Sequence, residues 1–141
     1  MNPVVVAAVD LDHEDRDRNV AATAARLAMA ATAALHLVYI IPEPQETYIR
    51  AYVPKEMVSE VEHAAQRHLE ELAGEIASDG QTVDTHVLHG SIYVTLLAQA
   101  RDLGATVLVI GAHRPQLADF LLGPNSARVA RHAPCSVYIV R

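Results

Sequence analysis

The stretch from Val107 to Arg141, VLVIGAHRPQLADFLLGPNSARVARHAPCSVYIVR, decides how the rest of the chain is interpreted. It begins with an apolar run typical of a buried strand, and the run breaks at Gly111. A loop then leads through GPNS at 123–126 to a short helical segment ending at His132 and a last apolar strand. Open α/β proteins hold phosphate groups where a strand gives way to a glycine and a helix start. The function of the protein therefore depends on whether this loop still holds a phosphate.

The composition is that of one globular domain, residues 1–141. Of these residues 51% are hydrophobic and 20% are charged, which excludes a disordered chain. The formal net charge of -6 argues against DNA or RNA as a partner. The only cysteine, Cys135, allows no intrachain disulfide and no cysteine cluster for a metal. With no signal-peptide pattern and no apolar run near the ~20 residues of a membrane helix, we expect a cytoplasmic protein without a membrane partner.

Apolar patterning predicts an alternation of strands and helices. The expected strands are 4–9, 35–41, 82–88, 106–110 and 137–140. The expected helices are 14–34, 54–80, 92–103 and a segment ending at 132, with a loop at 42–53. This order predicts an α/β fold in which helices cover both faces of a parallel sheet. The alternating strand 82–88 is expected near an edge of that sheet.

The helix after Pro54 has the clearest apolar stripe. Its inward face is expected to hold residues three and four apart, namely Val58, Val61, Ala65, Leu69, Leu72 and Ile76. Pro54 is expected in its first turn, and Gly80 at its end. Gly90-Ser91 is expected to cap the helix that follows, and Gly104 to end it.

Ligands in such sheets bind at the carboxyl ends of the strands, at the switch point of the strand order. Asp10, the segment 38–41, Gly90 and the loop after Gly111 are therefore expected around one crevice. Some of these residues also have a purely structural explanation. Asp10 and Ser126 could serve as helix caps without binding a ligand, and Gly111 could simply allow a turn. His113 could contact phosphate or solvent, and Arg114 could clamp a ligand or be a solvated charge.

We expect no binding or catalytic role for the other polar residues considered. His86 and His89 are three apart on a strand and should face opposite sides of the sheet, so no metal site is expected. The acidic run at 12–17 is interpreted as a solvated face, and Cys135 as a small buried hydrophobe. No nucleophile is placed with a base, so we expect no enzyme, with weak ATP hydrolysis left open.

Several local motifs in one order resemble the universal stress protein family over the whole chain. They are VAAVD ending at Asp10, LVYII at 37–41, HGS at 89–91, VLVIGAH at 107–113, and GPNSARVARHAPCSVYIVR from Gly123. The resemblance implies a five-stranded parallel sheet of order 3-2-1-4-5, the adenine nucleotide alpha hydrolase-like fold. It also implies a homodimer paired through the last strand, by Val137, Tyr138, Ile139 and Val140, which would cover an open apolar edge.

One branch of that family binds ATP through Gly, two residues, Gly, nine residues, Gly, then Ser or Thr. Here Arg114 stands at the second glycine, Gly123 comes one residue early, and Pro124 replaces the hydroxyl residue. The resemblance implies a nucleotide site at Asp10, Val38, Tyr39, Ile40, Gly90, Gly111, His113, Arg114, Gly123, Asn125 and Ser126.

Two functional hypotheses follow. The first is a dimer that binds ATP or AMP in a stress response or in signalling, with Mg²⁺ only if ATP binds; AMP is favoured because the changes affect the phosphate end. The second is a universal stress protein that has lost nucleotide binding and serves as a dimeric interaction or regulatory module for an unknown protein partner.

Overall fold

The structure, a computed structural model, describes residues 2–11, 14–42, 54–112 and 124–141. Its five strands form one sheet in the order β3-β2-β1-β4-β5, in which every neighbouring pair is parallel. The strands are β1 (Val4–Ala8), β2 (Ala34–Ile41), β3 (Val83–His89), β4 (Val107–Gly111) and β5 (Ser136–Val140). The expected fold class and strand order are thus confirmed, and β3 lies at an edge as the pattern indicated.

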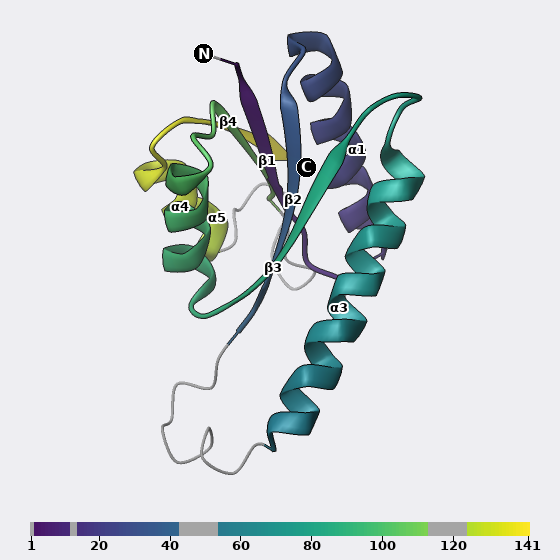
Figure 1. Ribbon diagram of the computed structural model, residues 1–141. Helices are drawn as coiled ribbons and strands as arrows, with labels where there is room; N and C mark the ends of the chain where they lie inside the picture. Colours follow the sequence, from purple (N-terminus) through teal and green to yellow (C-terminus); the bar gives the residue numbers. More distant parts are fainter. Residues whose placement is uncertain (1, 12–13, 43–53, 113–123) are drawn as a thin grey trace.

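In the part of the chain that the structure describes, four helices connect the strands and cover both faces of the sheet (Figure 1). They are α1 (Glu14–Ala31), α3 (Lys55–Ile76), α4 (Ile92–Asp102) and α5 (Pro124–His132). Helices α1 and α3 pack on one face, and α4 and α5 pack on the other. The strand order changes direction between β1 and β4, because β1 leads to α1 on one face and β4 leads toward α5 on the opposite face.

The core has two parts, one on each side of the sheet, because β-branched strand residues alternate between the two faces. On the first face, Val5, Ala7, Leu35 and Leu37 pack against the alanine-rich side of α1 and against Leu69 of α3. On the second face, a matching layer packs on α4 and α5; it contains Val6, Val38, Ile40, Leu96, Leu97, Ala100, Leu108, Ile110 and Val129. Small alanines let α1 lie close to the sheet, as its sequence indicated.

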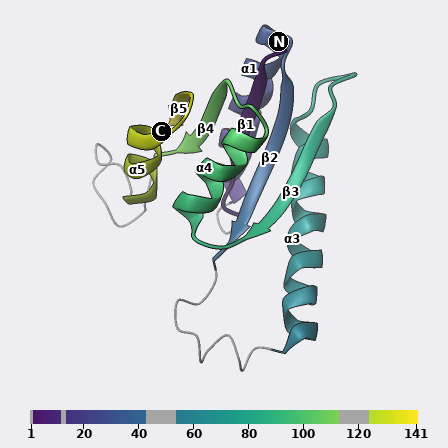
Figure 2. The same ribbon diagram turned by 60° about the vertical axis from the view of Figure 1, so that its left-hand side comes forward.

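Helix α3 departs from its sequence pattern in its first half. Leu69 is 0% exposed and Leu72 is 7% exposed, whereas Val58 and Val61 are 37% and 47% exposed. Figures 1 and 2 show the cause, since the N-terminal half of α3 projects past the end of the sheet. The expected inward face is therefore wrong for these two valines among the described residues.

Helix boundaries differ from the expected ones where the backbone changes conformation. Lys55 opens α3, so Pro54 is its N-cap residue and not part of the first turn. The helix ends at Ile76, because Ala77 is extended, and Gly80 lies in the turn beyond it with φ +79. Ser91 is the N-cap of α4 as expected, but its hydroxyl makes no capping hydrogen bond.

Helix α1 ends three residues earlier than expected, at Ala31, because Thr32 adopts a left-handed conformation with φ +51. The Thr32 N–H donates to the Met29 carbonyl at 3.2 Å, and the Ala33 N–H donates to the Ala28 carbonyl at 2.8 Å. This pair of bonds is the Schellman motif, whose left-handed position glycine normally occupies. Gly104, with φ +67, fills the same position after α4.

Replacing Thr32 with glycine is expected to raise the free energy of unfolding by about 1 kcal/mol. The glycine removes the clash of a β-branched side chain in the left-handed region, and this gain exceeds the extra backbone entropy of the unfolded chain. Urea denaturation at constant pH would measure the change. Thr32→Ala is the control, since alanine keeps a Cβ there; equal stability of the glycine and alanine variants would contradict the explanation.

The two sheet edges differ in character. On β3, His86 and His89 face opposite sides, as predicted: His86 approaches His36, with 2.9 Å between Nε2 and Nδ1, and His89 contacts Glu62 of α3. At the other edge, Tyr138 of β5 is 47% exposed and apolar. The β3 edge is therefore the more polar of the two.

The stability of the protein is expected to fall between about pH 7.5 and about pH 5.5 partly through His86. Burial, assisted by the nearby His36, lowers the pKa of His86, and Asp84 only partly opposes this shift. Between the lowered folded pKa and the ordinary value of 6.5, the unfolded chain binds more protons, so acidification favours unfolding. In His86→Gln, the urea midpoint should depend less on pH across this window; an unchanged dependence would contradict the role of His86.

Candidate functional site

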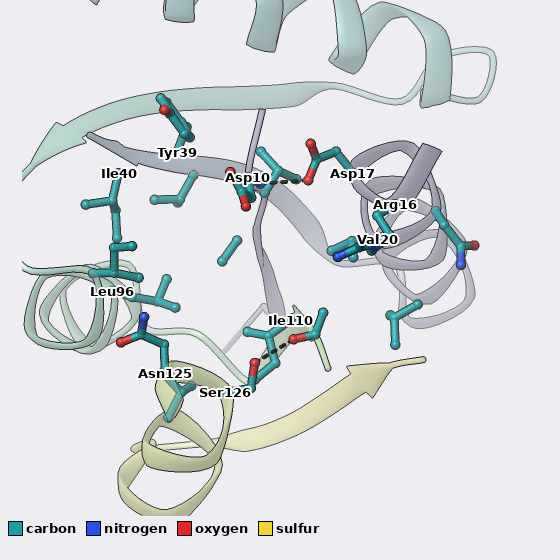
Figure 3. Close-up of a pocket in the computed structure, with 18 of the residues that line it drawn as sticks. Asp10, Arg16, Asp17, Val20, Tyr39, Ile40, Leu96, Ile110, Asn125 and Ser126 are labelled. Carbon is teal, nitrogen blue, oxygen red and sulfur yellow. Dashed lines mark hydrogen bonds between the residues drawn. The ribbon is translucent and has the colours of Figure 1, made fainter. Parts of the chain in front are cut away.

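A cavity of about 350 Å³ opens at the carboxyl ends of the central strands, where the strand order changes direction. Figure 3 shows its walls, with α1 on one side, α4 on the opposite side and α5 below. Its lining includes seven of the predicted site residues, namely Asp10, Val38, Tyr39, Ile40, Gly111, Asn125 and Ser126. The structure therefore brings together residues that lie far apart in the sequence, as expected for a switch point.

The wall formed by β2 is mainly apolar. Val38 and Ile40 are buried and Tyr39 is half-buried, and Leu96 of α4 adds a further apolar contact surface. The Val38 carbonyl already accepts a hydrogen bond from the Val9 N–H at 3.0 Å. This wall can therefore contact the flat face of a ring, while the Val38 carbonyl mainly joins the ends of β1 and β2.

Asp17 ties the end of β1 to helix α1. Its side chain is 5% exposed, and its Oδ1 accepts the Asp10 N–H at 2.8 Å (Figure 3). The interpretation of residues 12–17 as a solvated face is therefore wrong for Asp17, although Asp15 is exposed. The helical turn after Asp15 carries Asp17 inward, so this carboxylate sets the path of the chain that presents Asp10.

The first turn of α5 forms the lower part of the cavity. The Ser126 hydroxyl donates to the Gly111 carbonyl at 2.6 Å, which joins α5 to the end of β4. The first N–H groups of a helix have no acceptor within the helix, and they carry the positive end of its dipole. Proline suits the first position because that position needs no N–H donor. Pro124 is therefore compatible with an anion site formed by Asn125 and Ser126.

The cavity has charged residues that sequence analysis did not assign to it. Arg16 and Asp17 come from α1, and Arg141 follows β5. Further lining residues were also not assigned: Ala8, Val9, Asn19, Val20, Pro42, Ile92, Leu96, Ile110, Val129 and Val140. Arg16 and Asp17 lie in the first turn of the helix that follows β1, and this order was their only sequence signal, because it does not tell whether the turn faces solvent or the switch point.

Three predicted residues, His113, Arg114 and Gly123, lie outside the described residues. Gly90 is described but is not among the residues that line the cavity. It lies just after β3, where its N–H donates to the Ile41 carbonyl at 3.1 Å. The glycine has φ +137, and an added Cβ would lie 2.6 Å from the Thr95 Oγ1. Its backbone geometry therefore gives this position a structural reason to be glycine.

Across the described ranges, no cluster of three or more His, Cys, Asp or Glu side chains is placed to hold a metal ion. In the same ranges, every helix is too short or too polar to cross a membrane. Cys135 is half-buried, and burial raises the pKa of its thiol despite an opposing backbone hydrogen bond to Leu108. Cys135 was expected to be buried, so that part of the prediction is wrong, whereas a raised pKa keeps the thiol protonated, as expected for a small hydrophobe.

The fold and the position of the cavity define an open, doubly wound α/β protein with a cavity at its switch point, where ligands of such sheets bind. The universal stress protein family profile matches residues 1–141. The chain therefore belongs to the universal stress protein family, and its sheet has the adenine nucleotide alpha hydrolase-like fold.

Individual relatives agree with this assignment. Universal stress protein G of Salmonella typhimurium is 28% identical over 109 residues, which cover 76% of this chain and 77% of that protein. A universal stress protein from Archaeoglobus fulgidus, solved in complex with dAMP, has a TM-score of 0.72 and 21% identity, and the match covers 99% of this chain and 98% of that one. A universal stress protein solved in complex with cAMP has a TM-score of 0.74 and 20% identity, covering 100% and 99% of the two chains.

Proposed function

We propose that this protein binds an adenine mononucleotide in the cavity between β1, β2, β4 and α5, and that it acts by binding in a stress response or in signalling. The observation that carries the proposal is the cavity itself, which joins an apolar wall to a polar end at the switch point of the sheet. A volume of about 350 Å³ lies in the range of small-molecule sites.

The described residues fit the two halves of such a ligand. A purine ring is flat and apolar on its faces, so Val38, Ile40 and Leu96 offer it a matching surface. Asp10 at the end of β1 can accept hydrogen bonds from ribose hydroxyls, as carboxylates do in related α/β sites. The first turn of α5 offers the backbone N–H groups of Asn125 and Ser126 as hydrogen-bond donors to a phosphate, since the Ser126 hydroxyl donates to the Gly111 carbonyl.

Mononucleotides are favoured over ATP for two reasons. Two proteins with similar structures were solved with dAMP and with cAMP, each of which carries a single phosphate. The carboxylates Asp10 and Asp17 also line the cavity and offset the charges of Arg16 and Arg141, so the described lining has no excess positive charge to bind a long polyphosphate. If ATP bound, Mg²⁺ would be needed between its phosphates and Asp10.

The proposed role is binding without efficient catalysis. In the described lining, the Ser126 hydroxyl donates to the Gly111 carbonyl, and the Asp17 carboxylate accepts the Asp10 N–H, so this hydroxyl is not paired with a general base. Slow ATP hydrolysis would require Mg²⁺, as ATP binding itself would.

Calorimetric titration of the purified protein with AMP, cAMP, ATP and adenosine tests the proposal, together with mass spectrometry of any small molecule released on denaturation. We expect heat of binding with AMP and weaker or no heat with ATP. Absence of both a released nucleotide and any heat at millimolar ligand would reject nucleotide binding. That result would favour the alternative function, a dimeric interaction module. This alternative is supported by Arg114 and Pro124, which replace residues of the family's ATP-binding motif.

We also propose that two copies pair through β5. The strand lies at an edge of the sheet and presents Tyr138, which is 47% exposed, beside the partly buried Val137, Ile139 and Val140. Unpaired backbone groups on an apolar edge favour association with a second strand. Tyr138→Asp should give monomers in sedimentation velocity, while Asp84→Lys on the opposite edge should leave dimers. A dimer that persists in Tyr138→Asp and in Ile139→Asp would exclude this interface.

A further inference from the structure

Arg16 occupies a position that the family motif does not describe. It is the third residue of α1, it is half-buried, and it lines the cavity on the α1 side (Figure 3). Ile40 and Leu96 lie on the other side of the cavity in the same view. An arginine in this place is thus held beside the ligand space by its helix and not by a loop.

Arg18, on the same helix, lies outside this cavity, so not every arginine at the start of α1 reaches it. Arg18 lies two residues after Arg16 in α1, and side chains two residues apart on a helix point in different directions. Its guanidinium donates to Glu75 of α3, at 2.7 Å from Nη2 and 3.1 Å from Nε, outside the large cavity. Helix geometry therefore directs Arg16 toward the cavity and Arg18 toward α3.

The charge of the cavity also depends on Arg16. The described lining includes two carboxylates, Asp10 and Asp17, and two guanidinium groups, Arg16 and Arg141. The formal charges of these four residues cancel, although the whole chain has a net charge of -6. Without Arg16, an anionic ligand would meet an excess of negative charge at the carboxyl end of β1. A guanidinium has five N–H donors, so it can hold a neighbouring side chain and a ligand at once.

We propose that Arg16 is a specificity-determining residue that selects nucleotides with a terminal phosphate monoester. The inference rests on the proposed function, because it assigns the phosphate of the bound nucleotide to the space between Arg16 and the first turn of α5. A phosphate monoester presents three terminal oxygens and a charge near -2 to the planar guanidinium fork. A cyclic phosphodiester presents two such oxygens and one charge, and adenosine presents none.

The test compares AMP, cAMP and adenosine on the full chain by calorimetry, in wild type and in Arg16→Gln. AMP affinity is expected to fall on the order of tenfold to a hundredfold, which is the usual effect of losing charged hydrogen bonds. The affinity for cAMP should fall less, and the affinity for adenosine should stay unchanged. Retained adenosine binding also shows that the cavity has folded correctly in the variant.

Two further variants complete the design. Arg16→Lys keeps the charge without the fork and should recover only part of the AMP affinity. Arg18→Gln removes an arginine from the same helix outside the large cavity, and it should bind AMP like wild type. Equal losses for AMP and adenosine in Arg16→Gln, or no loss for AMP, would overturn the role of Arg16 while the proposed function stands. A wild-type protein that binds none of the three compounds would overturn both.

Discussion

Leu69→Ala is expected to lower the free energy of unfolding by about 3 to 4 kcal/mol. Leu69 is 0% exposed, and it fills the space between α3, α1 and the sheet, so truncation would leave a cavity that the surrounding side chains cannot close. Urea denaturation followed by circular dichroism would measure the loss. The protein should remain folded, since such a loss lies within the stability of a typical domain.

The matched control lies on the same helix. Val61 belongs to the same apolar stripe in the sequence, but it is 47% exposed. Val61→Ala should therefore change the free energy of unfolding by less than about 0.5 kcal/mol. If Val61→Ala cost as much as Leu69→Ala, the first half of α3 would have to be covered in solution, contrary to the exposure of Val61.

Gly90→Ala is expected to lower the free energy of unfolding by about 2 to 3 kcal/mol, from two sources of strain. The backbone conformation at φ +137 is one that side chains rarely adopt, and the new Cβ would lie 2.6 Å from the Thr95 Oγ1. Chemical denaturation of the purified variant would give the total cost. Because Gly90 is not among the lining residues, AMP affinity of the folded variant should stay close to wild type.

A double variant separates the two sources. In Gly90→Ala with Thr95→Ala, the Oγ1 that blocks the Cβ is gone, so part of the stability should return. The backbone strain should remain, and Thr95→Ala alone provides the baseline. Full recovery in the double variant would mean that φ contributes nothing, and no recovery would mean that the contact with Thr95 contributes nothing.

The carboxyl ends of β1, β2 and β4 were identified as the site because parallel strands end at one edge of the sheet. Asp10, Val38 and Gly111 follow directly from that rule, and the structure places all three around the cavity, whereas Gly90, expected by the same rule, is not among the lining residues. Arg16 and Asp17 were missed because a charged segment after a strand has the same composition whether it faces solvent or a cavity. Only the direction in which α1 leaves β1 distinguishes the two cases.

The sequence by itself determined the alternation of strands and helices, the parallel sheet and the family, because continuous apolar strands and local glycine motifs depend on near neighbours. Its stretch from Val107 to Arg141 predicted the end of the last helix and the last strand within about one residue, but it placed GPNS at 123–126 in the loop, whereas α5 begins at Pro124. The tertiary structure decided which apolar residues are buried, where α1 and α3 end, and which charges enter the cavity. These properties depend on how far each helix reaches along the sheet and on which atoms lie opposite it. A periodic pattern cannot specify either, since Val61 and Leu69 occupy equivalent positions in the stripe but only Leu69 lies over the sheet.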